Sequence, residues 1–135
     1  MATFETEVPS WADWNAAHLQ LGRFGAWYKE QLIGWIALSP VSKRHAYRGV
    51  AEVSVYIDQE FARKGVGSRL MDLLITESEK AGLWTLQSGI FPENLASINI
   101  HKKKGFRIIG YREKIAQRHG VWYDNVLMER RSKHF

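Results

Sequence analysis

One stretch limits the possible folds more than any other: an alternating strand that runs through a glycine-rich turn into an amphipathic helix. Within residues 51–58, Val53 and Val55 fall on one face of a strand, while Glu52 and Ser54 fall on the other. A period of two predicts a β-strand with one buried face. This strand is the clearest element of the chain.

The helix that follows the turn is predicted to run to Ala81. Its apolar residues, among them Leu70 and Leu73, recur with a helical period, and Gly82 is a natural C-terminal stop. Residues 85–91 predict another strand. A strand–helix–strand succession implies a parallel pair of strands joined by a right-handed crossover.

Shorter elements flank this unit on both sides. The flanking hairpins indicate a mixed sheet, and the order α-β-β-β-α-β-α-β-β indicates a mixed α/β fold. The length indicates a single domain, residues 1–135. The other predicted elements are a helix over 10–19 with Ser10 as N-cap, strands over 25–30 and 33–38, a basic loop over 41–50, a helix over 94–105, and strands over 106–113 and 121–129.

Composition excludes several classes of protein. The chain has no cysteine, which excludes disulfides and a cysteine nucleophile, so we expect a reducing cytoplasmic compartment. The net charge of +5 suggests an anionic partner. No apolar run approaches the ~20 residues that cross a bilayer, the N-terminus has no signal-peptide pattern, and no nucleic-acid-binding motif is present. We therefore expect neither a membrane nor a nucleic acid as partner. No histidine pair has metal-ligand spacing, so we expect no metal.

The turn itself carries a chemical signal. Gly65 and Gly67 let the backbone approach a ligand closely, and the first N–H groups of the following helix have no partner within the helix. These donors, together with the helix dipole, favour a bound pyrophosphate. The segment is neither a Walker loop nor a dinucleotide fingerprint. On these residues alone, a tight connection with no ligand is an equally good interpretation.

Three segments, 52–57, 62–68 and 94–106, are informative when they are read together. They resemble the acetyl-CoA-binding core of the GCN5-related N-acetyltransferases, and most closely that of their phosphinothricin acetyltransferase branch. Four further segments extend it over essentially the whole chain: 2–7, 34–40, 44–48 and 118–124.

The resemblance implies a mixed sheet that splays open, with acetyl-CoA between the strands at 52–58 and 85–91. It also implies direct attack of an amine on the thioester, in a ternary complex. Family members usually have an extra strand and helix before the region that matches Ala2, Thr3 and Phe4. We therefore expect the given sequence to lack these two elements, either because the protein is a shortened form or because its N-terminal residues are missing. Ala62 stands where the family usually has Arg or Gln.

Two residues are candidates for acid–base catalysis. Glu52 is the candidate base, because a carboxylate can take the amine proton directly or through water. The alternative is a solvated residue at the start of a strand. By resemblance, His101 lies where many family members have a tyrosine proposed as general acid. An imidazole can protonate the leaving thiolate or serve as a second base. The alternative is a packed helix histidine.

The resemblance also implies a set of cofactor-binding residues. A backbone N–H near Val55 or Tyr56 is expected to meet the developing oxyanion, and the backbone of Ile57 to contact the pantetheine arm. Asn94 is expected to reach the cofactor, although it can instead be only a helix N-cap. The turn contributes Arg63, Lys64, Gly65, Val66, Gly67 and Ser68.

The same resemblance implies candidate substrate-binding residues. Phe4, Arg44 and Tyr47 match positions that contact the amino-acid-like substrate, and a guanidinium suits a carboxylate or phosphinate. Ser54, which shares the strand face of Glu52, is a further candidate substrate contact. The alternative for the basic loop is a solvated surface segment. We expect the six tryptophans in the core and in a subunit interface.

The function predicted from the sequence is N-acetyl transfer from acetyl-CoA to the primary amine of an amino-acid-like small molecule, of the phosphinothricin, methionine sulfoximine or methionine sulfone type. The alternatives are a non-catalytic or weakly active coenzyme A-binding protein, or an acetyltransferase for a different amine. The resemblance also suggests a homodimer.

Overall fold

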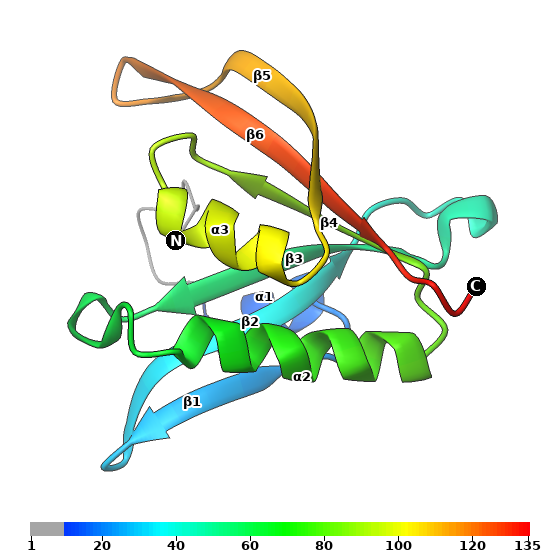
Figure 1. Ribbon diagram of the computed structural model, residues 1–135, viewed down its shortest axis with the longest axis horizontal. Helices are drawn as coiled ribbons and strands as arrows, with labels where there is room; N and C mark the ends of the chain where they lie inside the picture. Colours follow the sequence, from blue (N-terminus) through cyan, green and yellow to red (C-terminus); the bar gives the residue numbers. More distant parts are fainter. Residues whose placement is uncertain (1–9) are drawn as a thin grey trace.

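The computed structural model describes residues 10–135, which form a six-stranded mixed sheet with three α-helices (Figure 1). The strands lie in the order β1-β2-β3-β4-β6-β5. Phe4 lies outside the described residues. In chain order the elements are α1 (Trp11–Ala17), β1 (Phe24–Tyr28), β2 (Gln31–Pro40), the 3₁₀ helix η1 (His45–Tyr47), β3 (Val50–Ile57), the 3₁₀ helix η2 (Gln59–Phe61), α2 (Val66–Lys80), β4 (Thr85–Ile90), α3 (Leu95–Lys103), β5 (Arg107–Arg118) and β6 (Val121–Arg131).

The predicted order of elements is confirmed, and the largest difference is the length of β5. It continues to Arg118, whereas the sequence pattern ends the strand at residue 113. The strand passes through an irregularity between Arg112 and Ala116, where Lys114 adopts a positive φ of 48°. The Lys114 N–H donates to Asp124 Oδ1 at 2.8 Å, which holds the bulge against β6.

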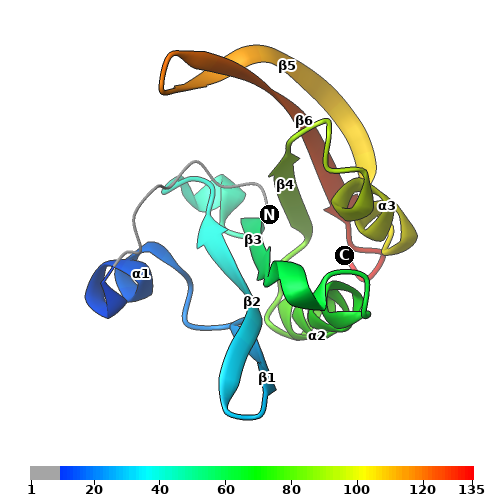
Figure 2. The ribbon, with the colours of Figure 1, turned by 90° about the vertical axis from the view of Figure 1, so that its left-hand side faces the viewer.

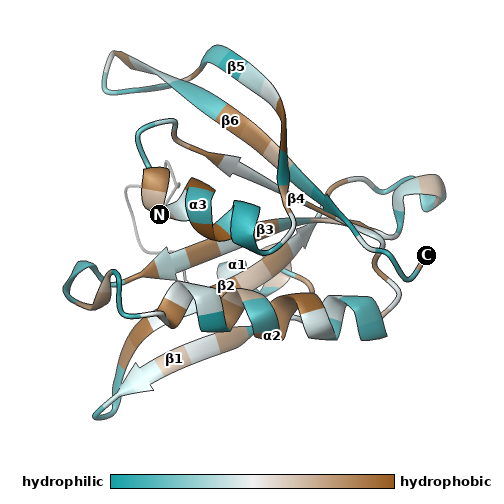
Figure 3. Ribbon diagram, viewed as in Figure 1, coloured by the Kyte–Doolittle hydropathy of each residue, from teal (hydrophilic) through white to brown (hydrophobic). Residues whose placement is uncertain are grey.

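The helices cover the sheet on both faces. Figure 2 shows α1 on the opposite side of the sheet from α2 and α3. The main core lies between the sheet and α2, where Leu38 and Leu86 of the strands pack with Leu70, Met71 and Leu74. Hydrophobic residues follow one side of α2 in Figure 3, as the helical period of the sequence predicts.

The expected placement of the tryptophans in the core is wrong, because none of the six is fully buried. Trp14 packs edge-on against Trp35 at 5.6 Å between ring centroids, and Trp35 stacks on Tyr56 at 6.5 Å. These three side chains join α1 to strands β2 and β3, on the face of the sheet away from α2. Trp11, Trp27 and Trp122 are exposed.

Strands β3 and β4 separate after a short parallel contact, as expected. Their register comprises three pairs and ends at Glu52 opposite Gln87, although β3 continues to Ile57. Beyond that pair the two strands diverge, and Figure 2 shows the space between their ribbons. The splay places the end of the β3–β4 contact in the middle of the sheet.

Candidate active site

Glu52 occupies the apex of the splay. It belongs to the last β3–β4 pair, and Gln87 Nε2 donates to Glu52 Oε1 at 3.3 Å. The carboxyl group is half-buried on the face that also carries Ser54 and Tyr56. Val53, one residue on, is buried on the other face. The alternation predicted from the sequence therefore sets the direction of the Glu52 side chain.

Backbone groups line the gap beyond Glu52. The antiparallel register of β2 with β3 extends from Ala51 to Ile57. In such a pair alternate residues direct their N–H and C=O groups toward the partner, and the others direct them away. Alternate groups between Val53 and Ile57 therefore face β4, where no described strand pairs with them. Val55 and Tyr56 lie within this segment, which offers unpaired hydrogen-bonding groups to an extended ligand.

The first turn of α2 also lacks side-chain partners. Gly65 is the N-cap with a φ of 83°, and no side chain bonds to the turn that follows. By contrast, Ser10 caps α1 and Asn94 caps α3. A Cβ added at Gly65 would meet no atom within 4 Å, so the space in front of the turn is open. The N–H groups of residues 66–68 thus have no side-chain cap, and the space beside the N-cap residue is open.

The residues of the turn are mostly accessible. Arg63 and Lys64 are exposed, whereas Val66, Gly67 and Ser68 are half-buried. Arg63 also adopts a positive φ of 63°, which bends the chain between η2 and α2. Two cationic side chains therefore lie beside the uncapped helix end.

His101 lies inside the molecule rather than on an open surface. Its ring is 1% exposed and contacts Phe106 edge-on. Nδ1 lies 2.7 Å from Ser97 O, and because a carbonyl can only accept, Nδ1 carries the proton. Nε2 lies 3.0 Å from Ser88 Oγ and accepts from that hydroxyl in the neutral ring. Burial lowers the pKa of His101, an effect that the bond to Ser97 partly opposes.

Glu52 and His101 do not contact each other. Gln87, which binds Glu52, and Ser88, which binds His101, are consecutive residues of β4. Consecutive strand residues point to opposite faces, so the carboxylate and the imidazole lie on opposite faces of the sheet with β4 between them. Both are nevertheless anchored within two residues of the apex.

Asn94 uses its side-chain oxygen within its own helix. Oδ1 accepts the N–H of Ser97 at 3.2 Å, which matches the N-cap alternative. Among the described residues the amide nitrogen of Asn94 makes no hydrogen bond, and it remains a donor.

The two candidate substrate residues of the basic loop contact each other. The Arg44 guanidinium lies 5.9 Å from the centre of the Tyr47 ring, and both side chains are exposed. Within residues 10–135, no hydrogen bond or ion pair joins Arg44 to Glu52 or Ser54.

Sequence reasoning missed Gln87 and Ser88, the partners of the two candidate catalytic groups. Their signal is the alternation of β4, in which Leu86, Ser88 and Ile90 are buried and the residues between them are half-buried. A serine at a buried position of an otherwise apolar face indicates a polar partner. The identity of that partner depends on how α3 packs.

The described residues carry neither a metal-ligand cluster nor a membrane-spanning helix. In residues 10–135 no group of three His, Asp or Glu side chains is placed to hold a metal ion. No helix in that part of the chain is long and apolar enough to span a membrane.

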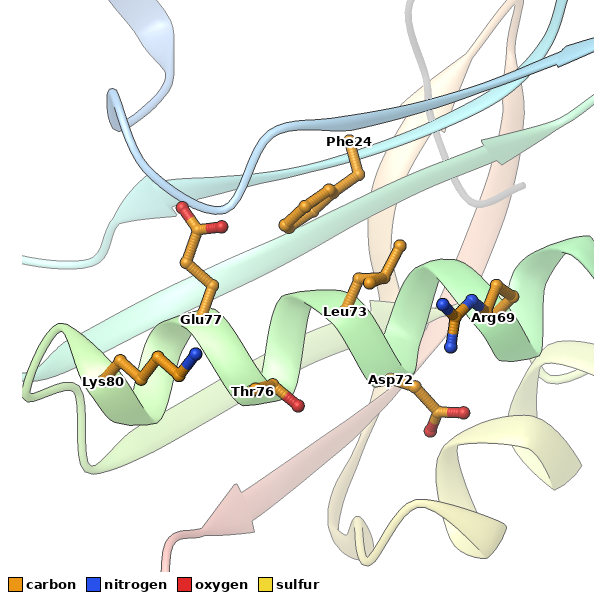
Figure 4. A pocket seen from close by; sticks show the side chains of 7 residues that line it. All are labelled: Phe24, Arg69, Asp72, Leu73, Thr76, Glu77 and Lys80. Atoms are coloured by element: carbon orange, nitrogen blue, oxygen red, sulfur yellow. The ribbon is translucent and has the colours of Figure 1, made fainter.

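A separate groove of about 290 Å³ lies between β1 and α2 (Figure 4). It is on the α2 side of the sheet, whereas the Glu52 side chain is on the other side. It is therefore not part of the apex. Its lining residues are Phe24, Arg69, Asp72, Leu73, Thr76, Glu77 and Lys80.

Comparisons with known proteins agree with this geometry. The model of the Acetyltransferase (GNAT) family matches residues 2–106. The L-methionine sulfoximine/L-methionine sulfone acetyltransferase of Pseudomonas aeruginosa is 27% identical over 134 residues, which cover 87% of this chain and 78% of that protein. The phosphinothricin N-acetyltransferase of Alcaligenes faecalis is 33% identical over 101 residues, which cover 74% of this chain and 51% of that protein.

Solved structures also match. The crystal structure of a GNAT superfamily phosphinothricin acetyltransferase from Sinorhizobium meliloti, in complex with acetyl-CoA, superimposes with a TM-score of 0.70 at 29% identity. The match covers 76% of this chain and 56% of that one.

Proposed function

Because the chain belongs to the GNAT acetyltransferase family, whose members use acetyl-CoA as donor, we propose that it acetylates the primary amine of a small amino-acid-like acceptor. Phosphinothricin, methionine sulfoximine and methionine sulfone are the proposed acceptors, since relatives are named for them. The observation that carries the proposal is the splay of β3 and β4, with Glu52 at its apex and an uncapped helix at its open end.

The residues around the splay fit coenzyme A. The uncapped amides of residues 66–68 suit a diphosphate, and the neighbouring Arg63 and Lys64 supply positive charge. The backbone groups of residues 53–57 that face β4 suit the amides of a pantetheine arm, with Ile57 nearest the turn. Asn94 has a free amide donor at the start of α3.

Glu52 is the proposed base. When bound, acetyl-CoA supplies a thioester carbonyl that is activated toward amines. Glu52 takes a proton from the attacking amine as the new C–N bond forms and the C–S bond breaks. A backbone N–H of β3 near Val55 or Tyr56 stabilises the charge that develops on the carbonyl oxygen, an effect worth ~3 kcal/mol for one well-placed donor.

His101 is proposed to take part in a second proton transfer, as general acid toward the leaving thiolate or as a second base. Its ring is buried, so protons reach it through the Ser88 hydroxyl, which bonds to Nε2. The protonated ring returns a proton toward the leaving thiolate by the same path; as a second base it would remove one.

The acceptor is proposed to lie on the Glu52 face of the sheet. Ser54 shares that face, and Arg44 and Tyr47 belong to the basic loop that leads into β3. A guanidinium there suits the acidic group of an amino-acid-like acceptor. Phe4 remains a proposed substrate contact on the strength of the sequence alone.

The test is release of free thiol from acetyl-CoA across an acceptor panel. Methionine sulfoximine, methionine sulfone and phosphinothricin are compared with glutamate, aminoglycosides and peptide N-termini. We expect turnover with the first group, and Glu52→Gln lowers kcat/KM by about 100-fold or more. Glu113 is an exposed carboxylate on β5, so Glu113→Gln is the matched control and is expected to keep the wild-type rate. An unchanged rate in Glu52→Gln removes Glu52 from the mechanism.

Two further proposals concern the setting of the enzyme. The absence of cysteine supports a cytoplasmic location. A homodimer is supported by exposed apolar side chains on β5 and β6, among them Ile108, Ile115 and Trp122. Light scattering after gel filtration tests this second proposal, and the mass of a single chain at micromolar concentration would contradict it.

A further inference from the structure

A row of polar side chains crosses the sheet at the level of Glu52. In register, Glu52 of β3 lies between Ser39 of β2 and Gln87 of β4. Gln87 in turn lies opposite Glu129 of β6, which lies opposite Arg107 of β5. The row therefore spans five strands, and Glu52 is its member at the apex of the splay.

Within this row Gln87 is the hydrogen-bonding partner of the Glu52 carboxylate. Its Nε2 donates to Oε1 at 3.3 Å, whereas Oε2 of Glu52 makes no hydrogen bond with any described residue. Gln87 is itself held between two buried neighbours, Leu86 and Ser88. One carboxylate oxygen is thus tied to β4 and the other is left for a ligand.

An amide suits this position better than a second carboxylate. Glu129, the next residue of the row, is ion-paired with Arg107 at 2.7 Å, so its charge is already compensated. A carboxylate at position 87 would stand directly opposite Glu52, and like charges in that arrangement repel. A glutamine donates a hydrogen bond without adding charge.

We propose that Gln87 is a positioning residue for the acetyl-transfer reaction. It fixes the rotamer of Glu52 so that Oε2 faces the acceptor amine, and it ties the base to the far side of the splay. The inference rests on the proposed function, since it requires Glu52 to be the base. Holding a reacting group in one geometry lowers the entropy lost on reaching the transition state.

Gln87→Met tests the inference, because it keeps the size of the side chain and removes the donor. We expect kcat to fall by about tenfold, because losing a hydrogen bond to a charged group has an effect of that order. We expect KM for acetyl-CoA to stay unchanged. In Gln87→Glu we expect kcat to fall by at least the same factor. Thr85→Ala, on the same strand and face, is the matched control and keeps the wild-type kcat.

A double-mutant cycle separates positioning from a merely structural role. If Gln87 acts through Glu52, adding Gln87→Met to Glu52→Gln lowers kcat no further. Crystal structures of Gln87→Met are expected to show the Glu52 carboxylate in a different rotamer, which is a readout independent of turnover.

Three outcomes overturn the inference. They are a wild-type kcat in Gln87→Met, losses that multiply in the double variant, and an unmoved Glu52 carboxylate in the crystal. A wild-type rate in Glu52→Gln, or no turnover on the whole acceptor panel, instead defeats the proposed function and this inference with it.

Discussion

His101 is held by two contacts that fix its charge as well as its position. The bond to Ser97 O assigns the proton of the neutral ring to Nδ1, and Ser88 Oγ then donates to Nε2. Protonation would require a buried cation and would reverse the bond to Ser88. The pKa of His101 is therefore lowered, chiefly by burial.

This lowered pKa predicts a pH dependence of stability. In the unfolded chain a histidine titrates near 6.5, so below that pH the unfolded state binds more protons than the native state. The free energy of unfolding therefore falls as the pH drops from about 6.5 toward the lowered folded-state pKa, by at most ~1.4 kcal/mol per pH unit. Urea unfolding between about pH 7.5 and about pH 5 measures it.

The matched variant is His101→Gln, which removes the titrating group at the same site. We expect a smaller slope of stability against pH in this window. Equal slopes in the two proteins would show that His101 is not the source. An NMR titration of the His101 ring in the wild type gives the folded-state pKa without any variant.

At Gly65 the constraint is on the backbone rather than on charge. A φ of 83° is a conformation that L residues adopt only with strain, yet the space where a Cβ would stand is open. Steric crowding in the described structure therefore does not explain the glycine. The positive φ does, because it turns the chain from η2 into α2 and leaves the first amides of the helix uncovered.

Helix α2 is fastened to the end of β6 by a small polar cluster. Ser132 Oγ donates to Glu79 Oε2 at 2.6 Å, and Arg130 approaches the same oxygen at 3.5 Å. The Ser132 hydroxyl is the main cause of the lowered pKa of Glu79, with Arg130 adding to it and burial opposing it. This cluster joins the C-terminal strand to the helix whose first turn is proposed to bind coenzyme A.

Glu79→Gln is expected to lower the free energy of unfolding by about 1–2 kcal/mol near neutral pH, since the side chain is only 18% exposed. Because the folded-state pKa is lowered, this contribution is present above the unfolded value of 4.5 and is lost as the pH falls through the folded value. The difference between variant and wild type should thus shrink in acid. Urea unfolding of the variant and the wild type, near neutral pH and again in acid below the unfolded pKa, measures this difference in the free energy of unfolding.

The control for this prediction is Glu129→Gln. Glu129 pairs with Arg107, whose side chain is 73% exposed, and exposed ion pairs contribute about 0–1 kcal/mol. A loss as large as that of Glu79→Gln, or a loss in Glu79→Gln that persists in acid, would contradict the account of the cluster.

Strand β5 shows why some elements are harder to predict than others. Its end beyond residue 113 lacks a clear alternation, and the strand continues by pairing with β6 from Ala116 to Arg118. At the bulge before that pairing, Asp124 of β6 accepts the N–H of Lys114 and the hydroxyl of Tyr111. That support comes from another strand. The strand at 51–58 and the helix after it were predictable because their periods are set by a face that is buried on a large core.

The candidate site divides in the same way. The direction of Glu52 and the uncapped turn follow from local pattern, namely the alternation of β3 and the glycine N-cap of α2. The burial of His101 and the hydrogen bond from Gln87 depend on the packing of α3 and on a parallel register, which no local period encodes. Residues from separate elements meet only once the sheet is assembled.

The assembled sheet has two parts, β1–β3 with α2 and β4–β6 with α3, and their direct strand contact is three pairs long. The proposed coenzyme site lies between them. Binding should therefore tie the two parts together and raise the free energy of unfolding by ~2.7 kcal/mol at a ligand concentration of 100 times Kd. Hydrogen exchange should slow at the alternate residues of 53–57 whose amides face the gap, and at residues 66–68 in the uncapped first turn of α2.

The tip of the β5–β6 hairpin is the internal control for this exchange experiment, because it lies far along the chain from both segments and projects away from α2 in Figure 1. Its exchange rates should not change on adding coenzyme A. Inorganic phosphate at the same concentration separates general anion binding from recognition of the whole coenzyme. Protection confined to the groove between β1 and α2, or absent altogether, would contradict the location of the site.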